Sequence, residues 1–207
     1  MFPCLTRDEV FRIETRRLWL RWPRLEDAAV MAPWIGLPEV ATMTSTFKVG
    51  MTVAEVAGRL EQNRASNASG KSMSFVMTPQ GADDQAIGML GVHVRPDGQL
   101  ELGYHLDPTH WGQGLMTEAV RALAVQVFEL APIAKIDAGV KPANPGSIRV
   151  LEKCGFKPAG GGEHESPLYG RYLVHRYALA RSKPSSLLAA QQRFGVVPPV
   201  HALCGLV

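Results

Sequence analysis

The feature that most constrains this chain is a glycine-rich turn between an expected strand, residues 100–106, and a long helix. The turn reads Trp111-Gly112-Gln113-Gly114, and the segment Thr117 to Leu130 is rich in Ala, Val and Leu at helical spacing. The first N–H groups of a helix lack partners and its dipole is positive there, so this turn suits a phosphate. A plain turn before a helix explains a Gly-x-Gly sequence equally well, so the turn alone does not decide the function.

Two common nucleotide motifs are absent from this turn. It contains no Gly-Lys-Ser/Thr, which excludes a P-loop, and no G-x-G-x-x-G, so no dinucleotide fold is signalled. The formal net charge of +3 suits an anionic ligand but is too small to indicate nucleic acid. Nucleic-acid binding is further disfavoured because Arg16, Arg17, Arg21 and Arg24 need not share a face and stacking aromatic residues are few.

Periodicity and turn residues predict a mixed α/β chain. Thr52 and Glu55 have the spacing of a capping box, and Pro96-Asp97-Gly98 indicates a hairpin turn. Hairpin strands come first and strand–helix–strand units later, which predicts a mixed sheet with helices on its faces. Strands are expected at 16–22, 72–78, 86–95, 100–106, 135–140, 156–159 and 171–180, and helices at 28–34, 53–67, 117–130 and 147–154.

Length and composition suggest a domain with an appendage. We expect a domain over residues 1–181 and an appendage over 182–207, which contains prolines and no acidic residue. The appendage could dock on the domain, dock on a second subunit in a homodimer, or be disordered.

Composition also indicates the compartment. No apolar run of about 18 residues is present, and residues 1–15 show no secretory signal. Cys4, Cys154 and Cys204 are widely spaced and odd in number, so reduced thiols, a cytoplasmic location and no metal site are expected.

Three segments resemble a known family in its own order. The segment from His105 to Ala119 resembles the acetyl-CoA signature of the GNAT superfamily, and in particular its RimJ/RimL-like branch. Asn144 to Phe156 resembles the second cofactor motif, and Glu14 to Arg21 with Leu25 to Asp27 is similar to the opening strand and helix. The resemblance covers about residues 12–180. It implies an α/β GNAT fold with mainly antiparallel N-terminal strands, a splayed central pair of strands, and helices on both faces.

The resemblance also implies where acetyl-CoA binds. The amides of the turn should hold the diphosphate, with the Thr117 hydroxyl assisting. The backbone around Leu106 should pair with the pantetheine arm, whose other end should bond Asn144. Met116 departs from the family, which has a small residue there, and its side chain must either crowd the phosphates or point away and pack. The expected cofactor residues are His105, Leu106, Trp111, Gly112, Gln113, Gly114, Leu115, Met116, Thr117 and Asn144.

Proton transfer has several candidate residues. The place of Glu101 resembles that of a general base found on this strand in GNAT enzymes, although a solvated carboxylate is the alternative. With period-two alternation Glu101 and His105 share one face, and His105 is either a second base or a structural histidine. The family often has a tyrosine seven residues after the Asn144 position, where this chain has Leu151. Ser147 is the substitute that the branch resemblance implies.

Other roles are open for Ser147, and other residues are candidates for the acid or for a nucleophile. Ser147 could instead simply cap a helix. Tyr104 and Tyr169 are less favoured candidates for the acid. Cys154 lies at a helix end, where the dipole raises a thiol pKa, so a covalent acyl-enzyme is disfavoured and direct transfer in a ternary complex is expected.

The acceptor amine should approach from the side opposite the cofactor. The expected walls are a loop from Trp34 to Phe47 and a loop from Gly160 to Tyr169. In the second loop Glu163 and Glu165 could attract a cationic acceptor, although solvated carboxylates are the alternative.

Two functions remain from the residues and the resemblance. The first is an acetyl-CoA-dependent N-acetyltransferase that acts on a protein N-terminal α-amine or a small-molecule amine. The alternative is a non-catalytic acyl-CoA-binding module, which the missing tyrosine and Met116 keep open.

Overall fold

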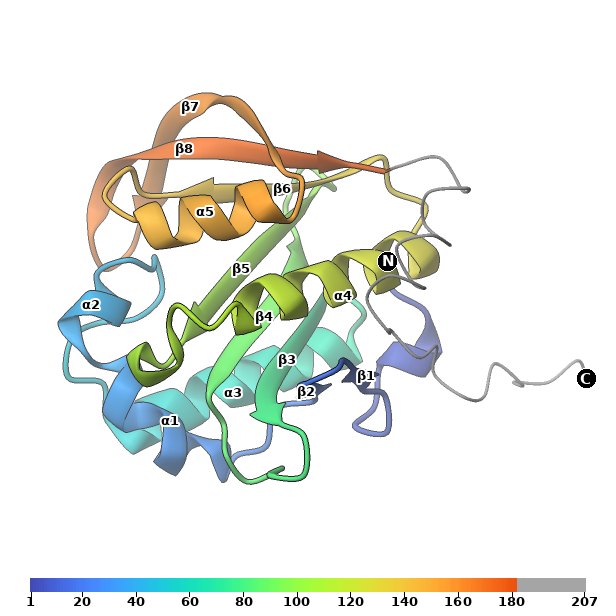
Figure 1. The fold of residues 1–207 in the computed structure, drawn as a ribbon, viewed down its shortest axis with the longest axis vertical. Helices are drawn as coiled ribbons and strands as arrows, with labels where there is room; N and C mark the ends of the chain where they lie inside the picture. The colour runs from blue at the N-terminus through green and yellow to red at the C-terminus, as the bar shows by residue number, and fades with distance from the viewer. Residues whose placement is uncertain (182–207) are drawn as a thin grey trace, which may run out of the picture.

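A computed structural model describes residues 1–181, in which the strands form one sheet in the order β1-β2-β3-β4-β5-β6-β8-β7 (Figure 1). Neighbouring strands are antiparallel except β5 and β6, which are parallel. The strands are β1 (Ile13–Glu14), β2 (Leu18–Arg21), β3 (Ser72–Pro79), β4 (Gly88–Val94), β5 (Leu100–Leu106), β6 (Lys135–Val140), β7 (Lys157–Ser166) and β8 (Gly170–Ala180).

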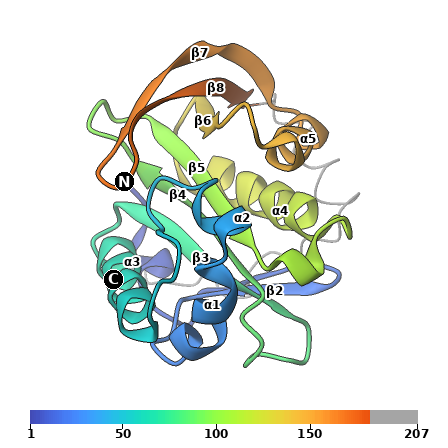
Figure 2. The same cartoon turned by 90° about the vertical axis from the view of Figure 1, so that its left-hand side faces the viewer.

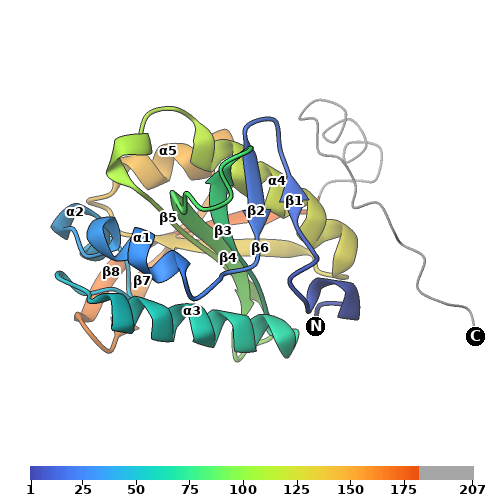
Figure 3. The same ribbon diagram turned by 90° about the horizontal axis from the view of Figure 1, so that it is seen from below.

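Helices cover both faces of the sheet, as expected. Figure 3 shows α1 (Asp27–Ile35), α2 (Pro38–Ala41) and α3 (Val53–Ala68) on one side, and α4 (Leu115–Leu130) and α5 (Pro145–Lys153) on the other. Short 3₁₀ turns lie at Cys4–Thr6 and Pro108–His110. Alternation along β3 divides the core, because Phe75 belongs to the apolar cluster under α4 and Val76 to the cluster under α1 and α3.

The splayed pair of strands is confirmed. Parallel pairing between β5 and β6 covers three residue pairs, from Leu100 with Ile136 to Leu102 with Ala138. Beyond Leu102, β5 continues for four residues to Leu106 and keeps its antiparallel partner β4, while β6 continues to Val140 beside β8. Beyond this stretch, the edge of β5 that faces β6 and the edge of β6 that faces β5 therefore have no strand partner among the described residues.

Local sequence signals predicted the boundaries of most helices and strands to within a few residues. The capping box at the start of α3 is present, with Thr52 Oγ1 accepting from the Glu55 amide at 3.3 Å and the Glu55 carboxylate accepting from the Thr52 amide at 3.0 Å. Strands β5 and β6 have the expected bounds. Helices α4 and α5 begin two residues earlier than expected, and β1 and α2 were not expected.

The prediction of a loop from Gly160 to Tyr169 is wrong. Strand β7 extends to Ser166 and includes Glu163 and Glu165, and it pairs with β8 up to the turn before Gly170. The glycines argued for a loop, but cross-strand pairing with the regular strand β8 outweighs their low strand propensity. A register shift between Pro158 and Gly161 absorbs the irregular part.

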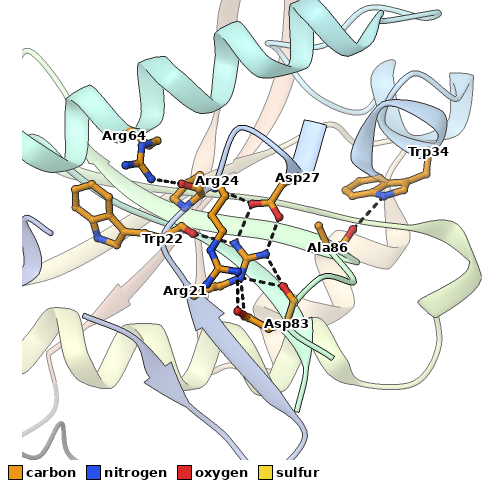
Figure 4. Close-up of polar contacts among 9 residues, drawn as sticks. Arg21, Trp22, Arg24, Asp27, Trp34, Arg64, Asp83 and Ala86 are labelled. Atoms are coloured by element: carbon orange, nitrogen blue, oxygen red, sulfur yellow. Dashed lines mark hydrogen bonds and ion pairs between the residues drawn. The ribbon is translucent and has the colours of Figure 1, made fainter. Parts of the chain in front are cut away.

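A buried ion pair fixes α1 against the sheet (Figure 4). The Arg21 guanidinium on β2 donates to both carboxylate oxygens of Asp27 at 2.6 and 2.9 Å, and its Nε donates to Asp83 at 2.7 Å. The side chains of Arg21 and Asp27 are only 5% and 4% exposed. Further along α1, the Trp34 indole N–H donates to the Ala86 carbonyl at 3.3 Å. These contacts determine where Trp34 meets the sheet.

We predict that Asp27→Asn lowers the free energy of unfolding by about 3–5 kcal/mol, because it leaves the buried Arg21 cation without its main partner. Urea denaturation monitored by circular dichroism measures this loss. Asp83→Asn is the matched control, and its loss should stay near 1 kcal/mol because the Asp83 side chain is 36% exposed. Equal losses in the two variants would contradict the central role of the Asp27 contact.

Candidate active site

The glycine-rich turn has the backbone shape of an anion site. Gly112 and Gly114 both have φ of 75°, and Gly114 is the N-cap of α4. This left-handed conformation is costly for residues with a Cβ, which explains why glycine occupies both positions. A Cβ built at Gly112 meets nothing within 4 Å, so the space outside the turn is open. The amides at the start of α4 face this side without intrahelical partners.

Contacts within the loop hold the turn against the end of β5. The Asp107 carboxylate accepts from the Thr109 amide at 2.9 Å. The Trp111 indole N–H donates to the Leu106 carbonyl at 2.9 Å, while about half of the residue remains exposed. Trp111 therefore has a structural role in the fold, and the Leu106 carbonyl already has a protein partner.

The departure at Met116 is accommodated by packing. Met116 is 5% exposed and belongs to the apolar cluster between α4 and the sheet, together with Leu115 at 7%. Its long side chain therefore points into the core and does not crowd the open side of the turn.

Arg17 is a residue at this turn that sequence reasoning missed. Its Nε donates to the Glu118 carboxylate at 2.7 Å, and its Nη1 donates to the Gln113 carbonyl at 3.0 Å. Thr15 Oγ1 and the Arg17 amide also donate to Glu118. Burial would raise the pKa of Glu118, but these hydrogen bonds outweigh it and lower the pKa. Arg17 and Glu118 each lie in a segment that resembles the family, and this was the available signal.

Glu101 lies on β5 in the stretch that pairs with β6, one residue before the last paired position, Leu102. Its side chain is 17% exposed, and His93 Nε2 on β4 lies 3.6 Å from its carboxylate. The hydrogen bond from His93 lowers the pKa of Glu101 in spite of burial. A Cβ at Gly139 on β6 would lie 3.4 Å from Glu101 Oε1, so the glycine leaves room for this carboxylate. Glu101 is therefore an ionised, sheltered carboxylate at neutral pH.

His105 is two positions further along the same face, and its residue is half-buried while its Nε2 atom is fully buried. Its ring packs against Phe47 with centroids 4.7 Å apart and against Trp34 at 5.7 Å. Burial lowers the pKa of His105 to about 3, and its Nε2 has no hydrogen-bond partner among the described residues. The lowered pKa favours a neutral ring at neutral pH, and the role of His105 as a base or as a structural residue stays a prediction.

Ser147 contacts Tyr104, whose side chain lies on the face of β5 opposite that of Glu101 and His105. The two hydroxyl oxygens are 2.8 Å apart, and the Tyr104 hydroxyl is also 3.1 Å from the Ser147 carbonyl. The helix-cap interpretation of Ser147 is wrong, because α5 begins at Pro145 and its N-cap is Asn144, whose side chain accepts from the Ser147 amide at 3.0 Å. The Ser147 hydroxyl is therefore not used as a cap, and it is in direct contact with the Tyr104 hydroxyl.

The Cys154 thiol is held as a neutral group. Its Sγ is 3.5 Å from the Thr117 carbonyl, and burial raises the pKa of Cys154 to about 11. A thiol with so high a pKa is a poor nucleophile.

Hydrogen bonds connect the segment after α2 with the β7–β8 hairpin, and Figure 2 shows the two segments side by side. The Tyr169 hydroxyl donates to the Phe47 carbonyl at 2.6 Å, and Ser166 Oγ donates to the Ser45 carbonyl at 2.8 Å. Lys141, which follows β6, donates to the Thr42 carbonyl at 2.6 Å.

The Lys141 ammonium also lies 4.7 and 4.1 Å from the ring centroids of Tyr169 and Tyr172. These contacts connect the end of β6, the β7–β8 hairpin and the segment after α2. Sequence reasoning missed Lys141 and Tyr172, because isolated Lys and Tyr positions carry no motif.

Glu163 and Glu165 are not brought together with Glu101. His164 pairs with Tyr172 across β7 and β8, with ring centroids 5.4 Å apart, while Glu163 and Glu165 occupy the alternate positions. Successive side chains of a strand point to opposite faces. The two carboxylates therefore point to the face opposite that of the His164–Tyr172 pair, and attraction of a cationic acceptor by them stays a prediction.

Other features of the described residues have no place in this site. A cavity of about 830 Å³ lies beside the Arg21 cluster, away from the turn, and its lining includes Arg12, Trp22, Arg24, Arg64 and Asp83. Within residues 1–181, no group of three or more His, Cys, Asp or Glu side chains could hold a metal ion, and no helix is long and apolar enough to cross a membrane. The expected appendage at 182–207 lies outside the described residues.

Acetyl-CoA fits the residues present. The turn offers free amides at a helix N-terminus with open space outside Gly112, and the parting of β5 from β6 leaves extended backbone beside it. The residues that would hold the diphosphate are those from Gly112 to Thr117.

Similarity to known proteins supports this interpretation. Residues 17–157 match the family described as an acetyltransferase (GNAT) domain. The "Probable N-acetyltransferase YjcK" of Bacillus subtilis (strain 168) is 44% identical over 98 residues, which are 46% of this chain and 54% of YjcK. That match thus spans about half of YjcK. The "Uncharacterized N-acetyltransferase p20" of Bacillus licheniformis is 30% identical over 148 residues, 70% of this chain and 82% of p20.

Solved structures share the fold. Mycobacterium smegmatis RimJ in complex with CoA-disulfide aligns with a TM-score of 0.73 and 21% identity, covering 94% of this chain and 99% of RimJ. The ribosomal-protein-S5-alanine acetyltransferase of Vibrio fischeri aligns with a TM-score of 0.68 and 21% identity, covering 84% of this chain and all of that one. The chain belongs to the GNAT family of acetyltransferases.

Proposed function

We propose that this protein is an acetyl-CoA-dependent N-acetyltransferase that transfers an acetyl group directly to a primary amine in a ternary complex. The observation that carries the proposal is the position of the Gly112–Thr117 turn beside the parting of β5 and β6. Glu101 and the Ser147–Tyr104 pair lie on the two faces of β5 near that point. An anion site, extended backbone and two groups for proton transfer are what acyl transfer to an amine requires.

The turn anchors the cofactor in this proposal. The amides from Gly112 to Thr117 hold the diphosphate, and the extended backbone near His105 and Leu106, where β6 no longer pairs with β5, aligns the pantetheine arm. The side-chain amide of Asn144 bonds the end of that arm. When bound, acetyl-CoA supplies the acetyl thioester. Backbone N–H groups near the parting stabilise the charge that develops on its carbonyl oxygen.

Glu101 acts as the general base in this proposal, through a water molecule. The carboxylate is ionised at neutral pH because its pKa is lowered, and it is sheltered by β6 and by His93. It accepts the proton that the acceptor ammonium must lose before its nitrogen can attack.

The Ser147 hydroxyl donates a hydrogen bond to the departing thiolate in this proposal. Burial raises the pKa of Tyr104, so this hydroxyl stays protonated, and its single O–H, which can donate to the Ser147 carbonyl or to Ser147 Oγ, donates to Oγ in the proposed complex. That donation frees the Ser147 O–H to point at the sulfur, and Tyr104 acts as a positioning residue. The neutral thiol of Cys154 supports direct transfer over a covalent acyl-enzyme.

The acceptor is either a protein N-terminal α-amine or a small-molecule amine. The Vibrio fischeri neighbour is named for the alanine of a ribosomal protein, but at 21% identity this likeness concerns the fold alone. The acceptor approaches on the face that carries Glu101, with the segment from Trp34 to Phe47 and the β7–β8 hairpin as its walls.

The experiment that tests the function supplies acetyl-CoA with a panel of amines and peptide N-termini and detects free thiol. Turnover with at least one acceptor supports the proposal. Binding of acetyl-CoA without turnover on any acceptor would favour the non-catalytic acyl-CoA-binding module, which Leu151 at the usual tyrosine position keeps open.

We predict that Glu101→Gln lowers kcat/KM about 100-fold at neutral pH, because the amide cannot accept a proton. The loss should shrink as pH rises, since more of the acceptor is then already neutral. The pKa of Glu101 in the folded protein lies below its ordinary value. The wild-type carboxylate should therefore become protonated, and stop acting as a base, only at acidic pH. Glu61→Gln on α3 is a charge-matched control. A pH-independent ratio of the rates would remove Glu101 from the mechanism.

We predict that Ser147→Ala lowers kcat about 10- to 100-fold with little change in the Kd of acetyl-CoA, because it removes the hydrogen bond to the leaving sulfur. Tyr104→Phe should lower kcat less, since Ser147 remains but loses its partner. Steady-state kinetics and calorimetric binding measure the two quantities. If Ser147→Ala lowers only the melting temperature, its hydroxyl is structural.

A further inference from the structure

The placement of Arg17 suggests a part of the cofactor site that the glycine-rich turn does not itself contain. Arg17 precedes β2, far in sequence from the turn, yet its side chain reaches the N-terminus of α4. Its guanidinium is held from two sides, by the Glu118 carboxylate at 2.7 Å and by the Gln113 carbonyl at 3.0 Å. The side chain is 37% exposed, so part of this held cation faces solvent at the turn.

The third nitrogen of the guanidinium faces the turn. Nε and Nη1 make the two contacts above, and Nη2 lies 3.8 Å from the position that a Cβ would take on Gly114. Gly114 is the N-cap of α4, next to the free amides of the first turn. A planar guanidinium directs its N–H groups in a fixed fork that matches phosphate oxygens.

We propose that Arg17 is a ligand of the coenzyme A diphosphate, held ready by Glu118 and by the Gln113 carbonyl. The inference rests on the proposed function, because it concerns the same cofactor site. It adds the guanidinium of the Arg17–Glu118 ion pair, with its directed N–H groups, to the backbone amides and the helix dipole. Because Glu118 already fixes the side chain, little conformational entropy is lost when the phosphate binds.

Arg17 could instead serve only to tie the β1–β2 hairpin to α4. Three probes separate the two roles, namely coenzyme A, 3′-dephospho-coenzyme A and pantetheine, measured by calorimetry on the full chain. Pantetheine lacks the diphosphate, and dephospho-coenzyme A keeps it. A diphosphate ligand therefore affects the first two probes and not the third.

We predict that Arg17→Gln raises the Kd of coenzyme A and of dephospho-coenzyme A about 10-fold each and leaves the Kd of pantetheine unchanged. Arg17→Lys keeps the charge but loses the fork, so its effect should be intermediate. Arg16→Gln is the matched control, because Arg16 is exposed and the change in net charge is the same. It should leave all three Kd values unchanged.

Folding is checked first, because Arg17→Gln also leaves Glu118 without its cation. If the melting temperature shows that Arg17→Gln does not fold, Arg17→Lys decides the question by the same ratio of Kd values. Equal Kd changes for all three probes, or none, would overturn the inference and leave the proposed function intact. Failure of the wild-type chain to bind coenzyme A would overturn both.

Discussion

The parting of β5 from β6 after three residue pairs is the constraint on which the rest of the structure depends. Backbone groups need partners, and a parallel pair that stops early leaves groups that must find them in side chains, water or a ligand. The parting occurs beside the N-terminus of α4, where further amides are free. The fold thus concentrates unused backbone donors and acceptors at one place. In the proposed function, an extended thioester with a diphosphate at its far end uses both sets.

Alternation along β5 separates the two kinds of proton chemistry. Glu101 and His105 point to the face covered by α1, while Tyr104 points to the face covered by α5 and meets Ser147. In the proposed mechanism a base and a hydrogen-bond donor thereby approach one thioester from opposite sides of a single strand. Burial makes His105 neutral and keeps Tyr104 protonated, which leaves Glu101 as the charged group of this strand segment.

Two arginines near the opening strand attach helices on opposite faces of the sheet. Arg21 binds Asp27 and fixes α1, which carries Trp34 toward the acceptor side. Arg17 binds Glu118 and fixes the start of α4, where the glycine-rich turn ends. The segment Glu14 to Arg21 is therefore more than an edge of the sheet, because its charges set the positions of both sides of the site. This explains physically why an opening motif accompanies the cofactor motif in a chain of this family.

The sequence by itself determined the elements whose signals are local. The capping box at Thr52, the turn at Pro96-Asp97-Gly98 and the Gly112–Gly114 turn depend on hydrogen bonds and dihedral angles within a few residues. Tertiary structure decided what depends on contacts between distant segments. Pairing with β8 made β7 a strand despite its glycines, Tyr104 met Ser147, and Lys141 and Arg17 gained partners about a hundred residues away. No local pattern encodes such contacts, because the sheet order and the helix positions create them.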